Sequence, residues 1–510
     1  MRFLLIASNQ FKHPWPVIPY GACCVAAAVR ASGHEVRVLD LCFSRDTEQD
    51  IQTALRGFQP HAVGVSIRNI DDGCAVAPHF FLDDIKEKVM VPLRKSFSGA
   101  LIIGGPAVGI NAAEMLDFFD IEYAALGDGE RVVVAFLDAL KANLTPIGIP
   151  GLLARKAGQE HLSVPPCNNS DLKDFPLPNM AEIIDVKPYL QFDGHFQVQT
   201  KRGCALRCTY CSYGAIEGSH YRLRDPSSVA DHIERVVKKT GVNHFEFTDS
   251  TFNIPLDHAK AVLRAIKQKG LKLRLRTMGL NPGAVDEELV RLMRETGFTN
   301  VDLGVESLSD ECLKALGKDF SVRDIFRAAD LLRRYRIPTN WFMLFGAPAE
   351  TEATIRETCT RLRKVVGFLD FVTVGIGIRA YKGTAIANMM QSENPAVTRD
   401  SFLSPVALEP RGLSLRELDL LVKIEASRQP QAYIFGPDQT MPFLVMRIVF
   451  GLWKLFLPAI PVWVVITLKN TVSTWLGLTA WRRVGLTREL AASRRAQEET
   501  STTEPRTGVI

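Results

Sequence analysis

The sequence lacks the features that would place it among secreted or nucleic-acid-binding proteins. Its formal net charge is only +5 over 510 residues, and that balance argues against a nucleic-acid partner. Its first apolar run, Phe3–Ala7, is too short for a signal peptide and suits a first strand instead. Apolar residues make up 46%, which is ordinary for a folded cytosolic protein, so we expect a cytoplasmic chain of two to four domains.

Regularly spaced cysteine pairs are also missing from most of the chain. Seven of the ten cysteines follow no spacing pattern, and a large chain without a secretion signal is not expected to form disulfides. We expect these seven to be small buried residues. They are Cys23, Cys24, Cys42, Cys74, Cys167, Cys312 and Cys359.

Residues 1–145 alternate short apolar runs with amphipathic stretches. This order predicts an α/β domain, a doubly wound parallel sheet whose ligands bind at the carboxyl ends of the strands. The strand candidates are Phe3–Ala7, Val36–Leu39, Ala62–Ile67, Ala100–Ile103 and Tyr123–Leu126. Residues 146–190 are rich in proline and glycine, are weakly periodic and are expected to be a linker.

A second alternating series over residues 191–395 predicts six βα units. Units at this spacing form a partial (β/α)6 barrel, in which the chemistry lies where strands end and loops begin. The strand candidates are Phe196–Thr200, His244–Thr248, Leu271–Met278, Asn300–Gly304, Thr339–Phe345 and Phe371–Ile378.

The C-terminal part changes character. Residues 396–490 are expected to be a helical region, and the polar residues 491–510 a disordered tail. Within the helical region, 441–481 is mostly apolar, but its uncharged piece Leu455–Leu468 has only fourteen residues, short for a bilayer span of about 20. Two interpretations stay open for this segment. One is a helix at a membrane interface, which the arginines that follow favour, and the other is a buried helix.

The strongest motif is Cys204-Ala205-Leu206-Arg207-Cys208-Thr209-Tyr210-Cys211, which follows Gly203 and a predicted strand. A four-iron cubane needs one terminal ligand on each iron, and thiolates supply it. Three thiolates on one short loop bind three irons and leave the fourth open, as a catalytic metal centre requires. The alternative is a zinc knuckle, but zinc takes four protein ligands, and no second cysteine pair is present.

On these residues the region 191–395 resembles the radical S-adenosylmethionine (SAM) superfamily. The resemblance implies a [4Fe-4S] cluster on Cys204, Cys208 and Cys211, with SAM chelating the open iron through its amino and carboxylate groups. One electron from the cluster would then break the sulfonium bond and give a 5′-deoxyadenosyl radical. The cofactors carry this chemistry, and the protein positions them.

The same resemblance implies SAM contacts at the ends of the predicted strands. Each of these residues also has a structural interpretation, because a carboxylate at a strand end is often a helix N-cap and a glycine is often a turn residue. The implied residues are Tyr210, Asp249, Ser250, Glu306, Ser307, Gly346 and Arg379.

Residues 1–145 resemble the cobalamin-binding domain that precedes the radical SAM domain in the subfamily of the anaerobic magnesium-protoporphyrin cyclase and many methylases. Small residues at consecutive strand ends would leave room for the nucleotide tail of cobalamin. The implied contacts are Ser66, Gly104, Gly105, Gly127 and Glu130. The loop after the first strand lacks the Asp-x-His-x-x-Gly pattern of mutase-type domains, and it also lacks the Gly-x-Gly-x-x-Gly turn of a nicotinamide site.

Both resemblances together imply a cobalamin-dependent radical SAM methylase that acts on an unactivated carbon of a small biosynthetic intermediate. The apolar C-terminal segment favours an apolar substrate. Such an enzyme needs an external one-electron reductant of the flavodoxin or ferredoxin type, and segment 441–481 would supply peripheral membrane contact. Two alternatives remain: a radical SAM cyclase or rearrangement enzyme with the same two domains, and a non-catalytic, membrane-associated metal-binding scaffold.

Overall fold

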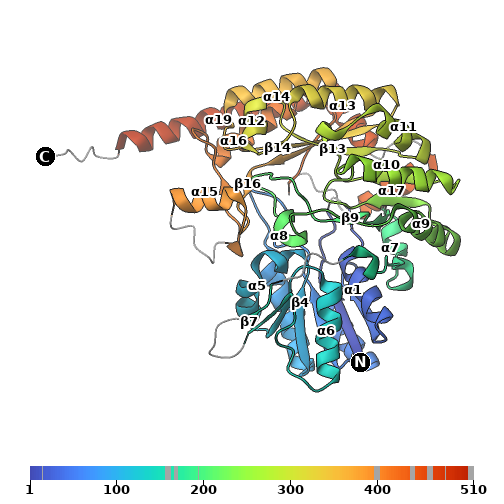
Figure 1. The fold of residues 1–510 in the computed structure, drawn as a ribbon. Coiled ribbons are helices and arrows are strands. Elements are labelled where there is room, and N and C mark those ends of the chain that lie inside the picture. Colours follow the sequence, from blue (N-terminus) through green and yellow to red (C-terminus); the bar gives the residue numbers. More distant parts are fainter. Residues whose placement is uncertain are drawn as a thin grey trace.

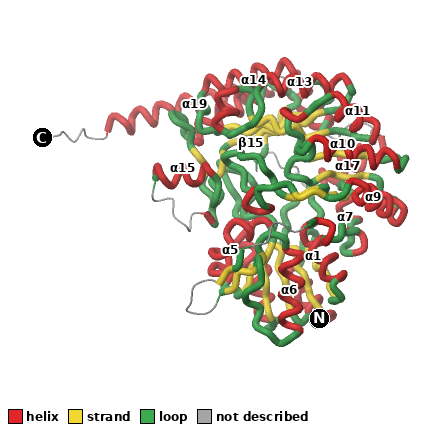
Figure 2. Tube along the Cα trace, viewed as in Figure 1, coloured by secondary structure: helices red, strands yellow, loops and turns green. Residues whose placement is uncertain are grey.

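The computed structural model describes residues 1–13, 15–155, 162–165, 171–192, 194–394, 402–436, 443–456, 463–476 and 478–503. Two units lie one above the other, and a C-terminal helix projects to one side (Figure 1). The lower unit holds the N-terminal sheet, and the upper unit is a curved set of strands with helices outside it, as Figure 2 shows. This is the α/β architecture that the sequence predicts.

The N-terminal sheet has the strand order β2-β1-β3-β4-β5-β6-β7, and β1 to β5 are parallel. All five predicted strands are present, within one residue of their predicted ends. The order turns back at β1, so the crevice between β1 and β3 is where such a sheet binds its ligand. The strands are β1 (Arg2–Ala7), β2 (Glu35–Asp40), β3 (Ala62–Ser66), β4 (Ala100–Gly104), β5 (Tyr123–Ala125), β6 (Leu152–Ala154) and β7 (Leu162–Ser163).

Helices cover both faces of this sheet, each over its own apolar core. One core includes Phe3 and Phe136 under α1 and α6, and the other includes Ile51, Leu93 and Met115 under α2, α4 and α5. The helices are α1 (Tyr20–Ala31), α2 (Thr47–Phe58), α3 (Phe81–Ile85), the π-helix η1 (Lys86–Met90), α4 (Val91–Ser96), α5 (Pro106–Phe119) and α6 (Gly129–Lys141).

The expected linker 146–190 is wrong in its first part. There β6 pairs antiparallel with β5, and β7 pairs antiparallel with β6, so the N-terminal sheet extends to Ser163 and is mixed at that edge. The strands were hidden because they have only two or three residues, too few for a periodic pattern. The remainder holds η2 (Leu172–Asp174), η3 (Met180–Glu182) and α7 (Lys187–Leu190).

The two main sheets of the upper unit contain the six predicted strands and one more. They form two sheets, β12-β11-β8 and β13-β14-β15-β18, which two isolated parallel bridges connect. The added strand β18 pairs parallel with β15, so part of the expected helical region belongs to the barrel. The strands are β8 (Phe196–Val198), β11 (His244–Phe247), β12 (Arg274–Thr277), β13 (Val301–Glu306), β14 (Thr339–Phe345), β15 (Phe371–Ile376) and β18 (Ala432–Ile434).

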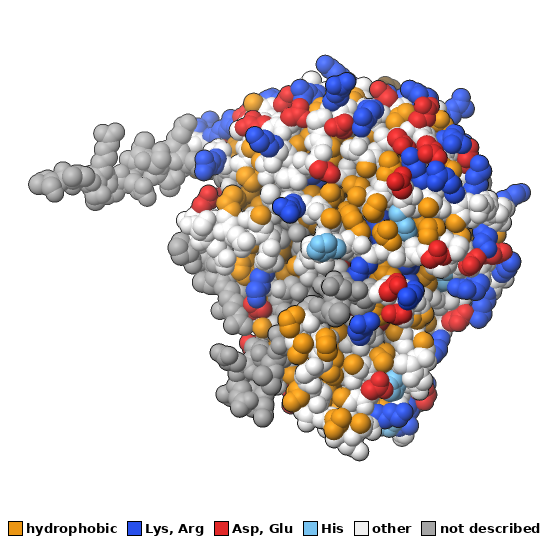
Figure 3. Space-filling view, in the orientation of Figure 1, with side chains coloured by type: hydrophobic (Ala, Val, Ile, Leu, Met, Phe, Trp, Pro, Cys, Tyr) orange, Lys and Arg blue, Asp and Glu red, His pale blue; other side chains and the backbone are white. Residues whose placement is uncertain are grey.

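Capped helices connect these strands around the outside. In α13 the Ser321 hydroxyl accepts from the Asp324 amide, and the Asp324 carboxylate accepts from the Ser321 amide, a capping box that stabilises the helix start. Acidic and basic side chains intermingle over these helices on the face in Figure 3. The helices are α9 (Pro226–Thr240), α10 (Leu256–Gln268), η4 (Pro282–Ala284), α11 (Glu287–Thr296), α12 (Asp310–Ala315), α13 (Val322–Arg334), α14 (Glu352–Val365) and α16 (Leu415–Ala426).

Short elements complete the upper unit at the carboxyl ends of its strands. They are β9 (Lys201–Arg202), α8 (Tyr213–Glu217), β10 (Arg222–Leu223), β16 (Ile378–Arg379), α15 (Ala385–Glu393) and β17 (Ala407–Leu408). β9 pairs antiparallel with β10, and β16 pairs antiparallel with β17.

Three helices end the described chain, of which the first two are mainly apolar and the third is mainly polar: α17 (Phe443–Phe456), α18 (Val464–Trp475) and α19 (Leu478–Thr503). The tail expected to be disordered from residue 491 is helical as far as Thr503, because α19 continues through it, and residues 504–510 lie outside the described part. Among the described residues, every helix is too short or too polar to cross a bilayer.

Candidate active site at the cysteine loop

The loop that carries Cys204, Cys208 and Cys211 starts directly after β9. Gly203 has φ +87°, and a Cβ at this position would lie 2.0 Å from the carbonyl oxygen of His220. The Cys204 amide donates to the Gly218 carbonyl at 3.0 Å, and Ser250 Oγ donates to the Gly203 carbonyl at 2.9 Å. Only glycine fits this turn. Ser250, which is one of the predicted SAM contacts, stabilises the loop through its hydrogen bond to Gly203.

The three thiols have the chemistry that a cubane requires. None is in a disulfide, Cys204 is buried, and Cys208 and Cys211 are half-buried. Burial raises the pKa of Cys211 to about 11, so cluster binding must displace a proton there. In the described part of the chain no three His, Cys, Asp or Glu side chains converge on a single ion.

Lys318, Glu306 and Tyr210 form a buried polar group beside the loop. Glu306 Oε1 accepts from the Tyr210 hydroxyl at 2.9 Å and lies 3.0 Å from Lys318 Nζ. Lys318 Nζ also donates to the Tyr210 hydroxyl at 3.1 Å. Burial lowers the pKa of Lys318, but Glu306, Tyr210 and Cys208 together outweigh this effect and hold that pKa well above its usual range. Lys318 is therefore charged within the site.

One oxygen of this group lacks a partner. Glu306 Oε2 is buried without a hydrogen bond, and Glu306 itself has φ +58° at a β-bulge of β13. A strained residue that aims an orphaned carboxylate oxygen at a site is typical of a ligand contact. This oxygen and the Lys318 ammonium match in charge the amino and carboxylate groups of an amino acid such as the methionine part of SAM.

Sequence analysis missed Lys318. The only local signal was Gly317, which has φ +68° and whose Cβ would lie 2.6 Å from the Arg207 carbonyl. The Thr209 amide donates to the Leu316 carbonyl at 3.0 Å, so the end of α12 is pressed against the cysteine loop. This close approach positions the lysine.

Asp249 is hydrogen-bonded to the segment that precedes the loop. Its side chain is fully buried, and its two oxygens accept from the Thr200 amide and hydroxyl and from Lys201. Lys201 is itself completely buried. Asp249 therefore stabilises the start of β9 directly before the loop, and its predicted contact with SAM stays a prediction.

The other predicted SAM residues lie farther along the carboxyl rim. Ser307 is buried and lies 3.2 Å from the Thr358 hydroxyl. Gly346 has φ +109°, and a Cβ there would lie 3.1 Å from Gly377 Cα. Arg379 forms an ion pair with Asp71 of the N-terminal unit at 3.2 Å. Their roles in SAM binding stay predictions.

Four of the five residues predicted to contact cobalamin lie in strand ends and turns of the N-terminal sheet, and the fifth, Glu130, lies at the boundary with the upper unit. A Cβ on Gly105 would lie 2.5 Å from the Ile67 carbonyl, and one on Gly104 would lie 3.4 Å from the Ala125 side chain. The space beside these two glycines is therefore filled by the protein itself. Ser66 accepts at its carbonyl from Ser8 Oγ at 2.9 Å, and Gly127 has φ +71° in the turn before α6.

Glu130 makes an ion pair across the boundary between the two units. Its Oε1 lies 2.5 Å from Arg202 Nη2, and neighbouring Asp128 lies 2.9 Å from Arg202 Nη1. Arg222 also forms an ion pair with Asp128. The acidic turn of the N-terminal unit therefore binds β9 and β10 through ion pairs, and the predicted contact of Glu130 with cobalamin stays a prediction.

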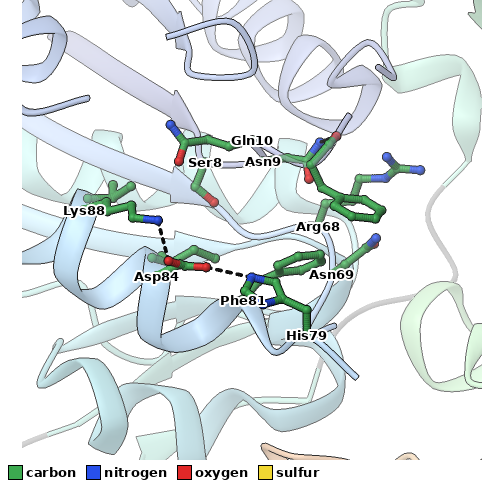
Figure 4. Close-up of a pocket in the computed structure, with 12 residues that line it drawn as sticks. Ser8, Asn9, Gln10, Arg68, Asn69, His79, Phe81, Asp84 and Lys88 are labelled. Carbon is green, nitrogen blue, oxygen red and sulfur yellow. Dashed lines mark hydrogen bonds and ion pairs between the residues drawn. The ribbon is translucent and has the colours of Figure 1, made fainter. Parts of the chain in front are cut away.

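A cavity of about 190 Å³ lies at the carboxyl ends of β1 and β3. Figure 4 shows Ser8, Asn9 and Gln10 on one side of it and Asp84 with His79 on the other. Hydrogen bonds from Lys88 and His79, at 2.5 and 2.8 Å, lower the pKa of the Asp84 carboxyl. This is the switch point of the sheet, where a ligand is expected.

The carboxyl edge of the N-terminal sheet faces the cysteine loop. Helix α5, which begins directly after Gly105, contacts α8, which begins two residues after Cys211. Burial lowers the pKa of Arg68, which follows β3, and Tyr213 of α8 and Glu246 of β11 oppose that effect. Ligands of the sheet edge and of the loop would therefore lie next to one another.

Comparison with known proteins identifies the domain that holds this loop. The model of the radical SAM superfamily matches residues 198–362. The chain contains a radical SAM domain. The prediction of a radical SAM enzyme is thereby confirmed, and the non-catalytic scaffold is set aside.

Several known proteins are similar to most of this chain. Tryptophan 2-C-methyltransferase from Streptomyces laurentii is 27% identical over 75% of this chain and 73% of its own. Anaerobic magnesium-protoporphyrin IX monomethyl ester cyclase from Cereibacter sphaeroides is 25% identical over 70% of this chain and 59% of its own. The radical SAM methyltransferase TsrM from Kitasatospora setae, solved with cobalamin and a [4Fe-4S] cluster bound, aligns with a TM-score of 0.69, 25% identity, and 77% and 75% of the two chains.

Proposed function

We propose that this protein is a cobalamin-dependent radical SAM methyltransferase that methylates an unactivated carbon of a small molecule. The observation that carries the proposal is the packing of α8, next to Cys211, on α5 at the carboxyl edge of the N-terminal sheet. This contact brings the cysteine loop close to the carboxyl edge of the N-terminal sheet, as a cluster and a cobalamin acting on one substrate would require. We take residues 1–163 as the cobalamin-binding unit and β8 to β18 as the radical SAM barrel.

SAM on the cluster supplies a carbon-centred radical and cobalamin supplies a transferable methyl group, so the chain itself has to bind and orient. Cys204, Cys208 and Cys211 hold three irons. Lys318 Nζ, which lies next to Glu306, would pair with the carboxylate of SAM, and the unpartnered Glu306 Oε2 would accept a hydrogen bond from its amino group. We place the edge of cobalamin in the cavity between β1 and β3, with Ser8 and Arg68 in its lining and Ser66 at the end of the adjoining strand β3.

The inner face of the barrel carries a row of polar side chains that suits the polar end of a substrate. Gln197, Glu246 and Arg276 are paired in register across β8, β11 and β12. Asn340 Nδ2 donates to Asp302 Oδ1 at 3.2 Å on the neighbouring strands. Gln197 Oε1 is buried without a partner and is available to a donor.

Apolar side chains lie one step nearer the carboxyl rim. Met278 and Phe342 come two residues after Arg276 and Asn340, so they share the same inner face. They remain 59% and 40% exposed there. A substrate whose polar end contacts the row of polar side chains, and whose apolar body contacts Met278 and Phe342 nearer the cysteine loop, fits this arrangement.

The remaining partners follow from this chemistry. We propose an external one-electron reductant of the flavodoxin or ferredoxin type and no nucleic acid. We place the enzyme in the cytoplasm, with peripheral membrane contact through residues 441–481.

Two anaerobic measurements test the proposal. The purified protein is reconstituted with iron, sulfide and hydroxocobalamin, and bound cobalamin is followed through its absorbance and its cob(II)alamin resonance. Labelled SAM and a reductant are then added. Methylated product together with S-adenosylhomocysteine and 5′-deoxyadenosine supports the proposal, and protein that takes up a cluster but no cobalamin contradicts it.

The second candidate is a radical SAM cyclase or rearrangement enzyme. The similarity to the magnesium-protoporphyrin cyclase over 70% of this chain favours it. The same assay separates the two, since a cyclase forms 5′-deoxyadenosine and a rearranged product without label transfer from the methyl group of SAM.

A further inference from the structure

The three C-terminal helices leave large hydrophobic side chains in solvent. Ten of the 21 such side chains in the described part of the chain lie between residues 448 and 484. On α17 and α18 they recur at intervals of three or four residues, so each helix presents one apolar stripe. The ten are Ile448, Leu452, Leu455, Leu468, Val472, Trp475, Leu476, Leu478, Trp481 and Val484, and we call them the C-terminal apolar face.

The opposite sides of these helices are packed against the amino ends of the barrel strands. Trp453 lies under the guanidinium of Arg274, the first residue of β12, at 5.9 Å. Trp463 stacks on Phe371, the first residue of β15, with ring centroids 5.7 Å apart. Asn470 Nδ2 donates to the carbonyl of Ala432, the first residue of β18, at 3.2 Å. The helices therefore cover the amino rim of the barrel, and the C-terminal apolar face lies on their outer side.

The charge of this region has one sign. Residues 439–488 contain six Lys or Arg and no Asp or Glu. The 56 acidic residues among 510 would place about five or six in a stretch of that length. Arg447, Lys469, Arg482 and Arg488 are exposed among the apolar side chains. A hydrophobic surface edged with cations is complementary to an anionic bilayer.

We infer that the C-terminal apolar face lies on the surface of an anionic bilayer. Helices α17 and α18 have 14 and 12 residues and are therefore about 21 and 18 Å long. The hydrocarbon core of a bilayer is about 30 Å thick, so these helices lie in the interface instead of crossing it. Trp475 and Trp481 are 84% and 82% exposed, and tryptophan is enriched at the headgroup level of membranes. Phe368 and Leu369 extend the surface, since Trp463 Nε1 donates to the Leu369 carbonyl.

This contact orients the enzyme. The cysteine loop follows β9 and is braced by Ser250, beyond the carboxyl end of β11, so it lies at the opposite rim of the barrel. An enzyme resting on its amino rim opens its site away from the bilayer. It therefore receives its substrate and its reductant from the aqueous side.

Vesicle binding by the full chain tests the inference. Protein is sedimented with vesicles of phosphatidylglycerol mixed with phosphatidylcholine, and with vesicles of phosphatidylcholine alone. We expect binding to the anionic vesicles, at least tenfold weaker binding to the neutral ones, and loss of binding at high salt. Tryptophan emission should shift to the blue on binding.

Two variants and a matched control locate the surface. Trp475→Ser with Trp481→Ser, and separately Arg482→Glu with Arg488→Glu, should each reduce binding at least tenfold. The control changes two exposed hydrophobic residues of the N-terminal unit, Leu144→Ser with Ile147→Ser, and should bind like the wild type. Iron content and melting temperature confirm that each variant is folded.

Two outcomes overturn the inference. One is wild-type protein that stays in the supernatant with anionic vesicles. The other is a concentration-dependent dimer that the Trp475 and Trp481 changes dissociate, which would assign the surface to a second copy of the chain.

Discussion

Arg202 and Glu130 form a buried ion pair that joins the two units of the molecule two residues before the first cluster cysteine. Their side chains are 9% and 4% exposed, and Arg202 Nη2 lies 2.5 Å from Glu130 Oε1. Burial lowers the pKa of Arg202, but Glu130 outweighs it and keeps that pKa well above its usual range. The pair therefore fixes the cysteine loop relative to the N-terminal sheet.

Replacing Glu130 with Gln should loosen this connection. It leaves Arg202 buried with one carboxylate fewer, and losing one partner of a buried pair costs about 3–5 kcal/mol. We expect a lower melting temperature and, with substrate, more 5′-deoxyadenosine released per methyl group transferred. Glu87→Gln, at an exposed position of the same unit, should change neither quantity. Unchanged melting and coupling in the Glu130 variant would show that the pair does not position the loop.

Lys318 should determine how tightly SAM binds. A hydrogen bond to a charged group contributes about 1.5–3 kcal/mol, so Lys318→Met should raise the dissociation constant for SAM about 10- to 100-fold. Equilibrium dialysis against labelled SAM measures it on protein with full iron content. Lys314→Met removes an exposed lysine of α12 and serves as the control. If both variants bind SAM alike, Lys318 has no part in the site.

Gly203 should be irreplaceable, whereas nearby Gly214 should not. A Cβ on Gly203 would lie 2.0 Å from the His220 carbonyl, while one on Gly214 of α8 meets no atom within 4 Å. Gly203→Ala should therefore lose most of its bound iron, and Gly214→Ala should keep it. Iron analysis after anaerobic reconstitution decides the matter, and full iron in Gly203→Ala would mean that the loop has another conformation.

Asp302 should make stability depend on pH. Burial raises the pKa of its carboxyl to about 7, from an ordinary value of 3.8, while Arg276 opposes the shift. Because the folded state then holds a proton that the unfolded state has released, the free energy of unfolding falls as pH rises from about 4 to 7, by at most about 1.4 kcal/mol for each pH unit.

Asp302→Asn removes this dependence. In denaturant titrations the variant should gain stability over the wild type between pH 5 and pH 7.5. Asp330→Asn, at an exposed position of α13, controls for the loss of a charge. A difference between variant and wild type that stays constant with pH would contradict the raised pKa.

The sequence was sufficient for the elements with regular patterns. Each predicted strand of both units is present, since apolar runs and intervening amphipathic helices are local signals. Strands of two or three residues such as β7 and β18 have too few residues for a period, so they were missed. The cysteine spacing is likewise local, and it located the loop without any knowledge of the fold.

The remaining site residues were harder to assign because their roles depend on distant partners. Asp249, predicted to contact SAM from a strand end, also accepts hydrogen bonds from Thr200 and Lys201. Glu130 is paired with Arg202, 72 residues away. Lys318 lies beside the cysteine loop because the turn at Gly317 packs against Arg207 and Thr209, a contact that no spacing rule reveals.

Cluster binding by the three cysteines is the claim on which the account depends most. The direct measurement is the iron content, the sulfide content and the low-temperature electron paramagnetic resonance spectrum of anaerobically prepared protein. The wild type is compared with Cys204→Ser, Cys208→Ser and Cys211→Ser, and Cys312→Ser serves as the control. We predict about four irons and four sulfides per chain and a reduced-cluster signal that SAM perturbs, in the wild type and the control only. Iron-free wild-type protein, or a full cluster in any of the three loop variants, would contradict it.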